Sequence, residues 1–191
     1  MPQAGYEYLL AYKITVPIYD YTVVFCNRAI HKMTPYFPPL SSTRTYDQMV
    51  QSGRSGMTNI LEGNKQQSLA GYIKLSGVAR GSIEELMKDY FAYGRQHQLT
   101  IWPREKSISE IREIGVIWNI IKTTPTLPDS PNFPHLPNHP ESAVNLMITL
   151  TKQAGYLQDQ LITSLKEKHM REGGFSEKLL KQRLDYRKKT S

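Results

Sequence analysis

Four long stretches of the sequence carry apolar residues every three or four positions and are separated by breaks rich in proline or glycine. The stretches cover about residues 6–33, 43–63, 69–97 and 141–172. This spacing is typical of helices with one buried face, and no stretch alternates apolar and polar residues as a strand would. The sequence therefore predicts an all-α fold, an up-down four-helix bundle with a helix-and-proline insertion between helices 3 and 4.

Local signals mark where these helices begin and end. Ser42 or Thr43 can cap the second helix, and Ser68 can cap the third. Gly63 suits the left-handed residue just past the end of the second helix. Pro17 lies inside the first apolar pattern, where it should kink the helix or mark its true start.

The insertion covers about residues 101–140. Six prolines among the 17 positions from 124 to 140 exclude helix and central strand. Before them we expect a short helix that is capped by Ser107 or Ser109 and runs to Ile121. Its apolar face is large enough to pack on another protein, and Trp102 and Trp118 are expected to anchor the insertion to the bundle. The predicted organisation is a bundle over residues 1–172, with a basic extension over 173–191.

Small residues are concentrated on the second and third helices. Each interior glycine costs a helix about 1 kcal/mol relative to alanine, which close helix packing would offset. We therefore expect the two helices to cross tightly through these positions; the alternative is a phosphate cradle. The residues are Ser52, Gly53, Ser55 and Gly56 on one helix and Ser76, Gly77, Gly81 and Ser82 on the other.

Polar residues on the same helices leave several interpretations open. Asn59 and Glu62 share a helix face, and Glu84 and Glu85 follow Ser82 closely. Carboxylates on neighbouring helices could act as general acid and base, could pair with Arg54 or Arg80, or could cap a helix. No nucleophile or metal ligand accompanies them, which favours structural roles.

A metal site is a weak alternative elsewhere in the chain. His135 and His139 are four residues apart, but in the proline-rich loop and without a nearby cysteine. We expect no metal and no cofactor.

The charge is concentrated at the C-terminal end. The chain has a net charge of +7 and a pI of about 9.4, which favours acidic partners such as nucleic acid. Residues 166–191 hold nine Lys and Arg against four Asp and Glu, so they supply +5 of this charge. A helix here would present cations to phosphates and turn Leu179, Leu180 and Leu184 inward, and Tyr186 could stack on a base. The alternatives are a solvated tail or a helix that docks on a neighbouring subunit. The basic residues are Lys166, Lys168, Arg171, Lys178, Lys181, Arg183, Arg187, Lys188 and Lys189.

Other features of the sequence bear on the expected cellular location of the protein. Cys26 is the single cysteine, so no disulfide can form within the chain, and its apolar neighbours predict burial. No run approaches the ~20 apolar residues of a membrane span, and the N-terminus lacks the pattern of a signal peptide. A cytoplasmic protein without a membrane partner is the simplest expectation.

Two short motifs carry a family resemblance. Asn59-Ile60-Leu61-Glu62-Gly63 and Gly81-Ser82-Ile83-Glu84-Glu85-Leu86 resemble signatures of the four-helix-bundle proteins encoded in bacterial rRNA intervening sequences. Gln48, Ser55 and Ser68 match further positions, and the resemblance covers about residues 40–100. The family includes the accessory variability determinant of diversity-generating retroelements.

The resemblance implies a bundle that assembles as a homopentamer, binds nucleic acid and partners a reverse transcriptase, with no known catalytic residues. This chain departs from short members at Met49, Val50 and Gln51, where those members often carry a basic pair. Arg44 and Arg54 are the cations that remain nearby.

Three hypotheses follow. The first is a non-catalytic, oligomeric accessory protein that binds RNA or DNA and assists a reverse transcriptase. The second is a protein-protein scaffold of the rRNA intervening-sequence type without a nucleic-acid role. The third, to which we give little weight, is a hydrolase that uses Glu62 and Glu85.

Overall fold

The regular structure of the chain is helical, as expected. The computed structural model describes residues 9–31, 37–129 and 131–190, and no strand occurs in these ranges. The predicted start of the first helix at residue 6 lies outside them. The helices are α1 (Leu10–Lys13), α2 (Thr15–His31), α3 (Thr43–Asn64), α4 (Leu69–Gln96), α5 (Arg104–Glu110), α6 (Arg112–Thr123), α7 (Pro140–Glu172) and α8 (Phe175–Thr190).

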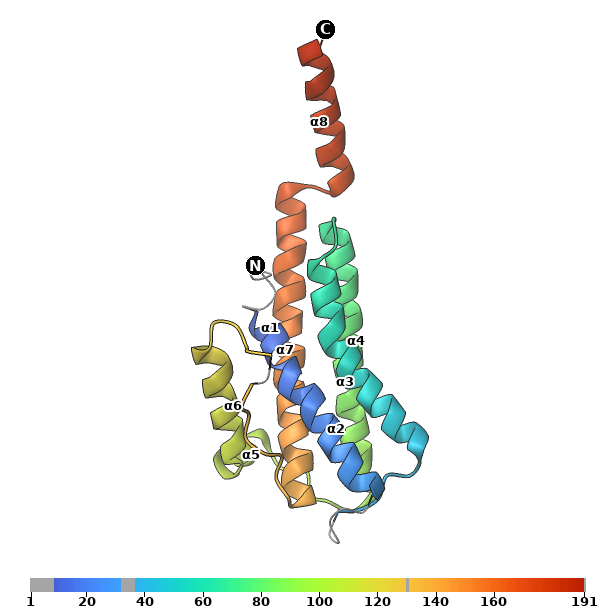
Figure 1. Cartoon of the computed structure of the whole chain (residues 1–191), viewed down its shortest axis with the longest axis vertical. Helices are drawn as coiled ribbons and strands as arrows, with labels where there is room; N and C mark the ends of the chain where they lie inside the picture. Colours follow the sequence, from blue (N-terminus) through green and yellow to red (C-terminus); the bar gives the residue numbers. More distant parts are fainter. Residues whose placement is uncertain (1–8, 32–36, 130, 191) are drawn as a thin grey trace.

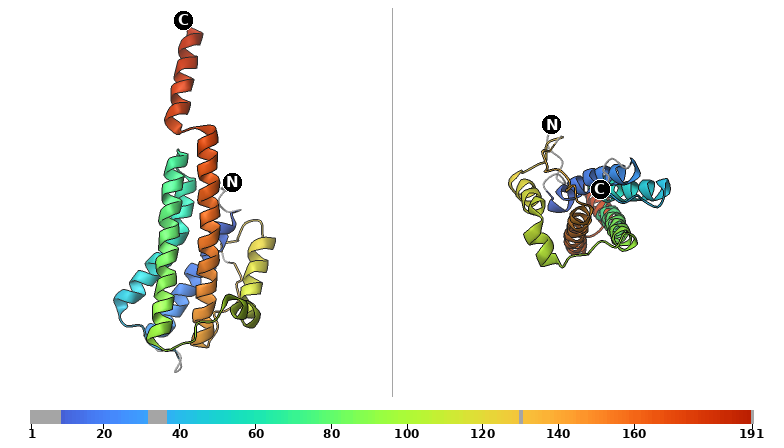
Figure 2. Two further views of the ribbon diagram at one scale, coloured as in Figure 1. Left: turned by 180° about the vertical axis from the view of Figure 1, so that it is seen from behind. Right: turned by 90° about the horizontal axis from the view of Figure 1, so that it is seen from below.

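Three long helices form the axis of the molecule. Figure 1 shows α3, α4 and α7 side by side, with α2 lying across their lower part. Figure 2 shows α5 and α6 against α7, on the flank away from α4. Helices α1 to α7 therefore pack together, whereas α8 projects beyond the end of α7. Among the described residues, no helix combines the length and apolar character needed to cross a membrane.

The starts of α3 and α4 agree with the sequence, and one predicted helix end does not. The Ser42 hydroxyl accepts a hydrogen bond from the Thr45 amide at 3.2 Å, and that of Ser68 accepts one from the Gly71 amide at 3.1 Å. Pro17 lies in the first turn of α2, so it marks a helix start. Gly63, however, is a residue of α3 and not the left-handed residue after it.

The insertion forms two helices where one was expected. Ile111 has extended backbone angles (φ −101°, ψ 91°) that end α5 and begin α6, so neither Ser107 nor Ser109 is a cap. The large apolar face is not left for another protein to cover, because it packs on the chain's own core. Its buried members are Ile111, Ile114, Ile117 and Ile121.

Both tryptophans anchor the insertion to α7, as predicted. The Trp102 indole donates to Glu141 Oε1 at 2.8 Å, and the Trp118 indole donates to Gln153 Oε1 at 2.7 Å. Asn145, which the sequence did not single out, accepts from the Trp102 amide at 2.7 Å and donates to the Thr100 carbonyl at 2.8 Å. The polar side of α7 thus fixes where the insertion begins.

The proline-rich segment is non-helical, as expected, and the N-terminal helices hold it in place. Tyr21 donates a hydrogen bond to the Pro134 carbonyl at 2.6 Å, and Arg28 donates to the Pro137 carbonyl at 2.8 Å. The buried Lys13 donates to the Thr124 carbonyl at 2.9 Å. Side chains from α1 and α2 therefore satisfy backbone carbonyls of a segment whose prolines lack amide donors.

Cys26 is buried in the main core, and its burial predicts an alkaline loss of stability. Burial, with a smaller contribution from the Asp89 charge, raises the pKa of the Cys26 thiol to about 12. Because the unfolded thiol ionises first, this stabilisation is present below the ordinary pKa of 9.0 and is lost as pH rises toward 12. Burial shifts the pKa of Tyr90 in the same direction.

We therefore expect the free energy of unfolding, measured with urea, to fall as pH rises above about 9. Native Cys26 should resist iodoacetamide at pH 8, and urea should expose it. Rapid alkylation of the folded protein would contradict this burial.

Candidate functional site

Glycines of α3 let α4 approach closely. A Cβ added at Gly56 would lie 2.5 Å from Ile83 Cδ1, and one at Gly63 would lie 2.6 Å from Tyr72 Cδ2. Gly53 lies against Leu86 and α2, at ordinary contact distance. The close crossing of these two helices is therefore confirmed on the α3 side.

The glycines of α4 do not take part, which corrects the prediction. Gly77 and Gly81 are exposed, and a Cβ added at either would meet no atom within 4 Å. The face of α4 that packs is made by its buried residues, among them Ala79 and Ile83. Gly77 and Gly81 share one face, as expected, but that face points away from α3.

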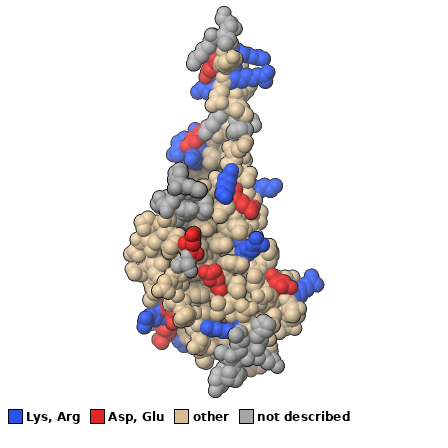
Figure 3. Space-filling view, in the orientation of Figure 1, with Lys and Arg blue, Asp and Glu red and all other residues tan. Residues whose placement is uncertain are grey.

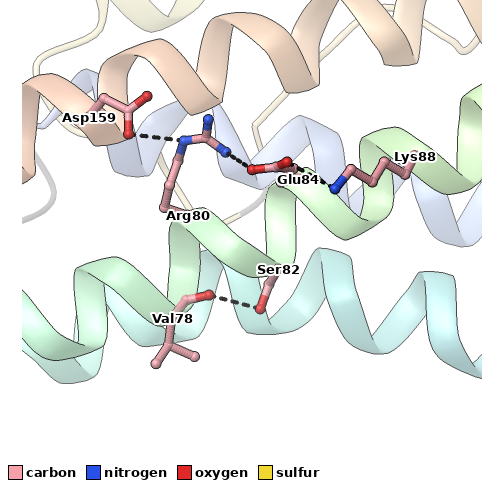
Figure 4. Close-up of polar contacts among 6 residues, drawn as sticks. All are labelled: Val78, Arg80, Ser82, Glu84, Lys88 and Asp159. Carbon is pink, nitrogen blue, oxygen red and sulfur yellow. Dashed lines mark hydrogen bonds and ion pairs between the residues drawn. The ribbon is translucent and has the colours of Figure 1, made fainter.

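Asn59, the first residue of the motif, is part of a polar chain between the two helices. Its amide donates to Ser55 Oγ at 2.8 Å, and Ser55 Oγ lies 2.9 Å from Ser82 Oγ. Ser82 Oγ donates to the Val78 carbonyl at 3.0 Å (Figure 4). The hydroxyls of Ser55 and Ser82 thus each accept one hydrogen bond and donate another. This fixes the direction of the hydrogen bonds and connects α3 to α4.

Glu84 belongs to an ion-pair network that joins α4 to α7. Arg80 Nε lies 3.0 Å from Asp159 Oδ1, and Arg80 Nη1 lies 3.2 Å from Glu84 Oε2 (Figure 4). Lys88 Nζ lies 3.0 Å from Glu84 Oε1, and this contact lowers the pKa of Glu84. The sequence alternative in which Arg80 pairs with a neighbouring carboxylate is therefore confirmed for Glu84.

The proposed acid-base pair, Glu62 and Glu85, is not brought together. Glu62 adjoins Gly63, which faces Leu75, and ten residues of helix from Leu75 to Glu85 span about 15 Å. Glu85 instead borders a hollow with Asp47 and Asp89. In the described part of the chain, which includes His135 and His139, no group of three or more His, Cys, Asp or Glu is placed to hold a metal ion.

The basic residues of the C-terminal end form an arm, which we define as residues 166–190. Figure 3 shows Lys and Arg gathered on the projecting α8, whereas both charge signs are interspersed on the body. The side chains of Lys178 and Lys189 fall outside the described part of the structure. Seven cations of the arm are exposed: Lys166, Lys168, Arg171, Lys181, Arg183, Arg187 and Lys188.

Arg44 and Arg54 do not join the arm. Both are exposed on α3, and Arg44 lies in its first turn, at the opposite end of the body from α8 (Figure 1). The structure therefore splits the predicted cations into one concentrated group and two isolated residues.

The leucines of α8 are exposed, contrary to the prediction that they face inward. Leu179, Leu180 and Leu184 are 48%, 58% and 47% exposed, and Tyr186 is exposed as well. Gly173 has a positive φ of 72° that ends α7, and α8 then continues away from the body (Figure 1). Among the described residues, no other helix packs along its apolar face (Figure 1).

A groove of about 900 Å³ that the sequence did not suggest lies between α6 and α7. Ile114 and Trp118 of α6 and Leu157 of α7 are apolar lining residues. Arg104, Lys122 and Lys152 supply the charged groups. We call this feature the α6/α7 groove.

Comparisons with protein-family models, with curated proteins and with solved structures give no match to this chain. The function is therefore argued from the residues and their placement.

Proposed function

We propose that the chain is a non-catalytic accessory protein that binds RNA or DNA through its basic arm. We further propose that it acts in the cytoplasm as a homo-oligomer and assists the reverse transcriptase of a diversity-generating retroelement. The observation that carries nucleic-acid binding is the arm itself, in which the end of α7 and the projecting α8 carry exposed cations.

The size of the arm supports phosphate binding. α8 has 16 residues and is about 24 Å long. Duplex DNA carries one phosphate per about 1.7 Å of axis, so a helix of this length can meet several phosphates at once. Because exposed Lys and Arg side chains of α8 would contact phosphates, which carry no base identity, we expect binding with little sequence preference.

The resemblance supports the remaining parts of the proposal. We assign α2, α3, α4 and α7 to the up-down four-helix bundle of the rRNA intervening-sequence family. Asn59 and Ser82, which stand in the two matching motifs, connect α3 to α4 through Ser55. A homopentamer would have five times the 21.9 kDa mass of the chain in sedimentation equilibrium.

The arm predicts a salt-dependent affinity that three cations control. We expect Lys181→Gln, Arg183→Gln and Lys188→Gln together to weaken binding of a labelled RNA about tenfold at about 0.1 M salt. The variant should also reduce the slope of log K against log salt, because fewer counterions are released. Fluorescence anisotropy between about 50 and 200 mM salt measures both effects.

The matched control removes the same charge from the body. Lys74→Gln, Arg95→Gln and Arg112→Gln change exposed residues outside the arm, so affinity should stay near that of the parent protein. Equal loss in both variants would mean that net charge alone drives binding. Absence of binding at low salt would remove the nucleic-acid role.

The α6/α7 groove favours a second candidate function, a protein-protein scaffold. A scaffold without a nucleic-acid role would retain its partner after nuclease treatment and would be indifferent to the arm variant. The parent protein, the arm variant and the control variant therefore distinguish the two candidate functions.

A further inference from the structure

The α6/α7 groove leaves apolar side chains exposed, although many other apolar residues of the chain are buried in the core. Ile114, Ile117 and Ile121 of α6 are buried on the side that faces the core. At the groove, Ile108 and Tyr156 remain 45% and 64% exposed. Trp118 forms part of the floor of the groove. Its position is fixed without a partner, because its indole Nε1 donates a hydrogen bond to Gln153 Oε1 at 2.7 Å.

In the described part of the chain, the charged residues that line the groove are all cations: Arg104, Lys122 and Lys152. Lys122 Nζ lies 5.2 Å from the centroid of the Trp118 ring, and Lys152 Nζ lies 5.2 Å from that of Phe91. Within the described residues, the ion pairs lie instead at Arg80, Glu84, Lys88 and Asp159, so these three cations have no carboxylate partner.

We propose that the α6/α7 groove binds an acidic amphipathic helix of a partner protein. Apolar side chains at i, i+3, i+4 and i+7 of that helix would occupy the floor. Its flanking carboxylates would meet Arg104, Lys122 and Lys152, which gives the complementary charge. The 12 residues of α6 are about 18 Å long, enough to support about three turns of a docked helix.

The lining favours a helix over a nucleic acid at this place. Leu10, Ile108 and Leu157 offer aliphatic surface, which suits leucine-type side chains better than stacked bases. The inference does not rest on nucleic-acid binding by the arm, since the two surfaces share no residue.

Gly115 provides a direct test. It lines the groove, and a Cβ added there would meet no atom within 4 Å, so Gly115→Phe can fill the groove without disturbing the core. Gly81→Phe is the matched control, because Gly81 is equally open but lies on α4, outside the groove. Lys122→Glu with Lys152→Glu tests the charge independently of shape.

The probe is a labelled synthetic helix of about 15 residues with leucines at the four spaced positions and glutamates beside them. We expect fluorescence anisotropy to give a Kd on the order of 1–100 μM with the full-length protein. Gly115→Phe and the double charge reversal should each weaken binding about tenfold, and Gly81→Phe should not. A scrambled peptide of the same composition should bind about tenfold more weakly, since its apolar face is lost.

Several results would overturn the proposal. One is equal binding of the ordered and scrambled peptides, which would reduce the contact to net charge. Another is unchanged binding by both groove variants. A third is displacement of the peptide by an RNA oligonucleotide whose own binding Gly115→Phe abolishes, which would make the groove a nucleic-acid site.

Discussion

Phe25→Ala is expected to lower the free energy of unfolding by about 3–5 kcal/mol. Phe25 is fully buried on α2, and its ring meets three other aromatic rings edge to face. The centroid distances are 5.1 Å to Phe37, 5.0 Å to Tyr90 and 4.9 Å to Tyr93. Alanine removes all three contacts and leaves a cavity between α2 and α4.

The matched control is the neighbouring residue. Val24 is 39% exposed on the same helix, so Val24→Ala should change stability by about 0.5 kcal/mol or less. Urea unfolding followed by circular dichroism measures both variants. A loss below about 1 kcal/mol for Phe25→Ala would mean that the aromatic cluster does not join these helices as described.

The sequence predicts helix boundaries best where the signal is local. Ser42 and Ser68 cap their helices because a hydroxyl reaches an amide three residues ahead, whatever the rest of the chain does. The glycine pair at 173 and 174 and the prolines before residue 140 end helices for equally local reasons.

Two predictions that depend on packing between distant parts of the chain were wrong. Gly63 carries the composition of a helix end, yet it lies within α3, where the missing side chain leaves space for Tyr72. Leu180 and Leu184 carry the spacing of a buried face, yet the chain turns at Gly173 and both leucines are exposed in the described structure. Periodicity shows which residues share a face, but not whether another element reaches that face.

The two candidate surfaces show the same limit. Composition alone is enough to find the arm, because its cations are concentrated in one segment of the chain. The α6/α7 groove joins Trp118 to Leu157, residues of two helices separated by the proline-rich segment. Only the fold brings such residues together, so no sequence pattern could have indicated the groove.

The contrast between Gly56 and Gly77 gives the sharpest test of the helix seam. At Gly56, even a Cβ would lie 2.5 Å and 2.7 Å from the Cδ1 and Cγ1 atoms of Ile83. Ile83 is itself buried, so Gly56→Leu would force Ile83 from its position or push α3 away from α4. We expect a loss of about 3 kcal/mol in the free energy of unfolding.

Gly77→Leu should act in the opposite direction. Gly77 is an exposed interior residue of α4 with open space around it, and leucine favours helix where glycine opposes it. A gain of up to about 1 kcal/mol is therefore expected, measured by the same urea unfolding as for Gly56→Leu. If Gly77→Leu proved the more damaging change, the packing face of α4 would be the one that carries Gly77 and Gly81. The register that places Gly56 against Ile83 and Gly63 against Tyr72 would then be wrong.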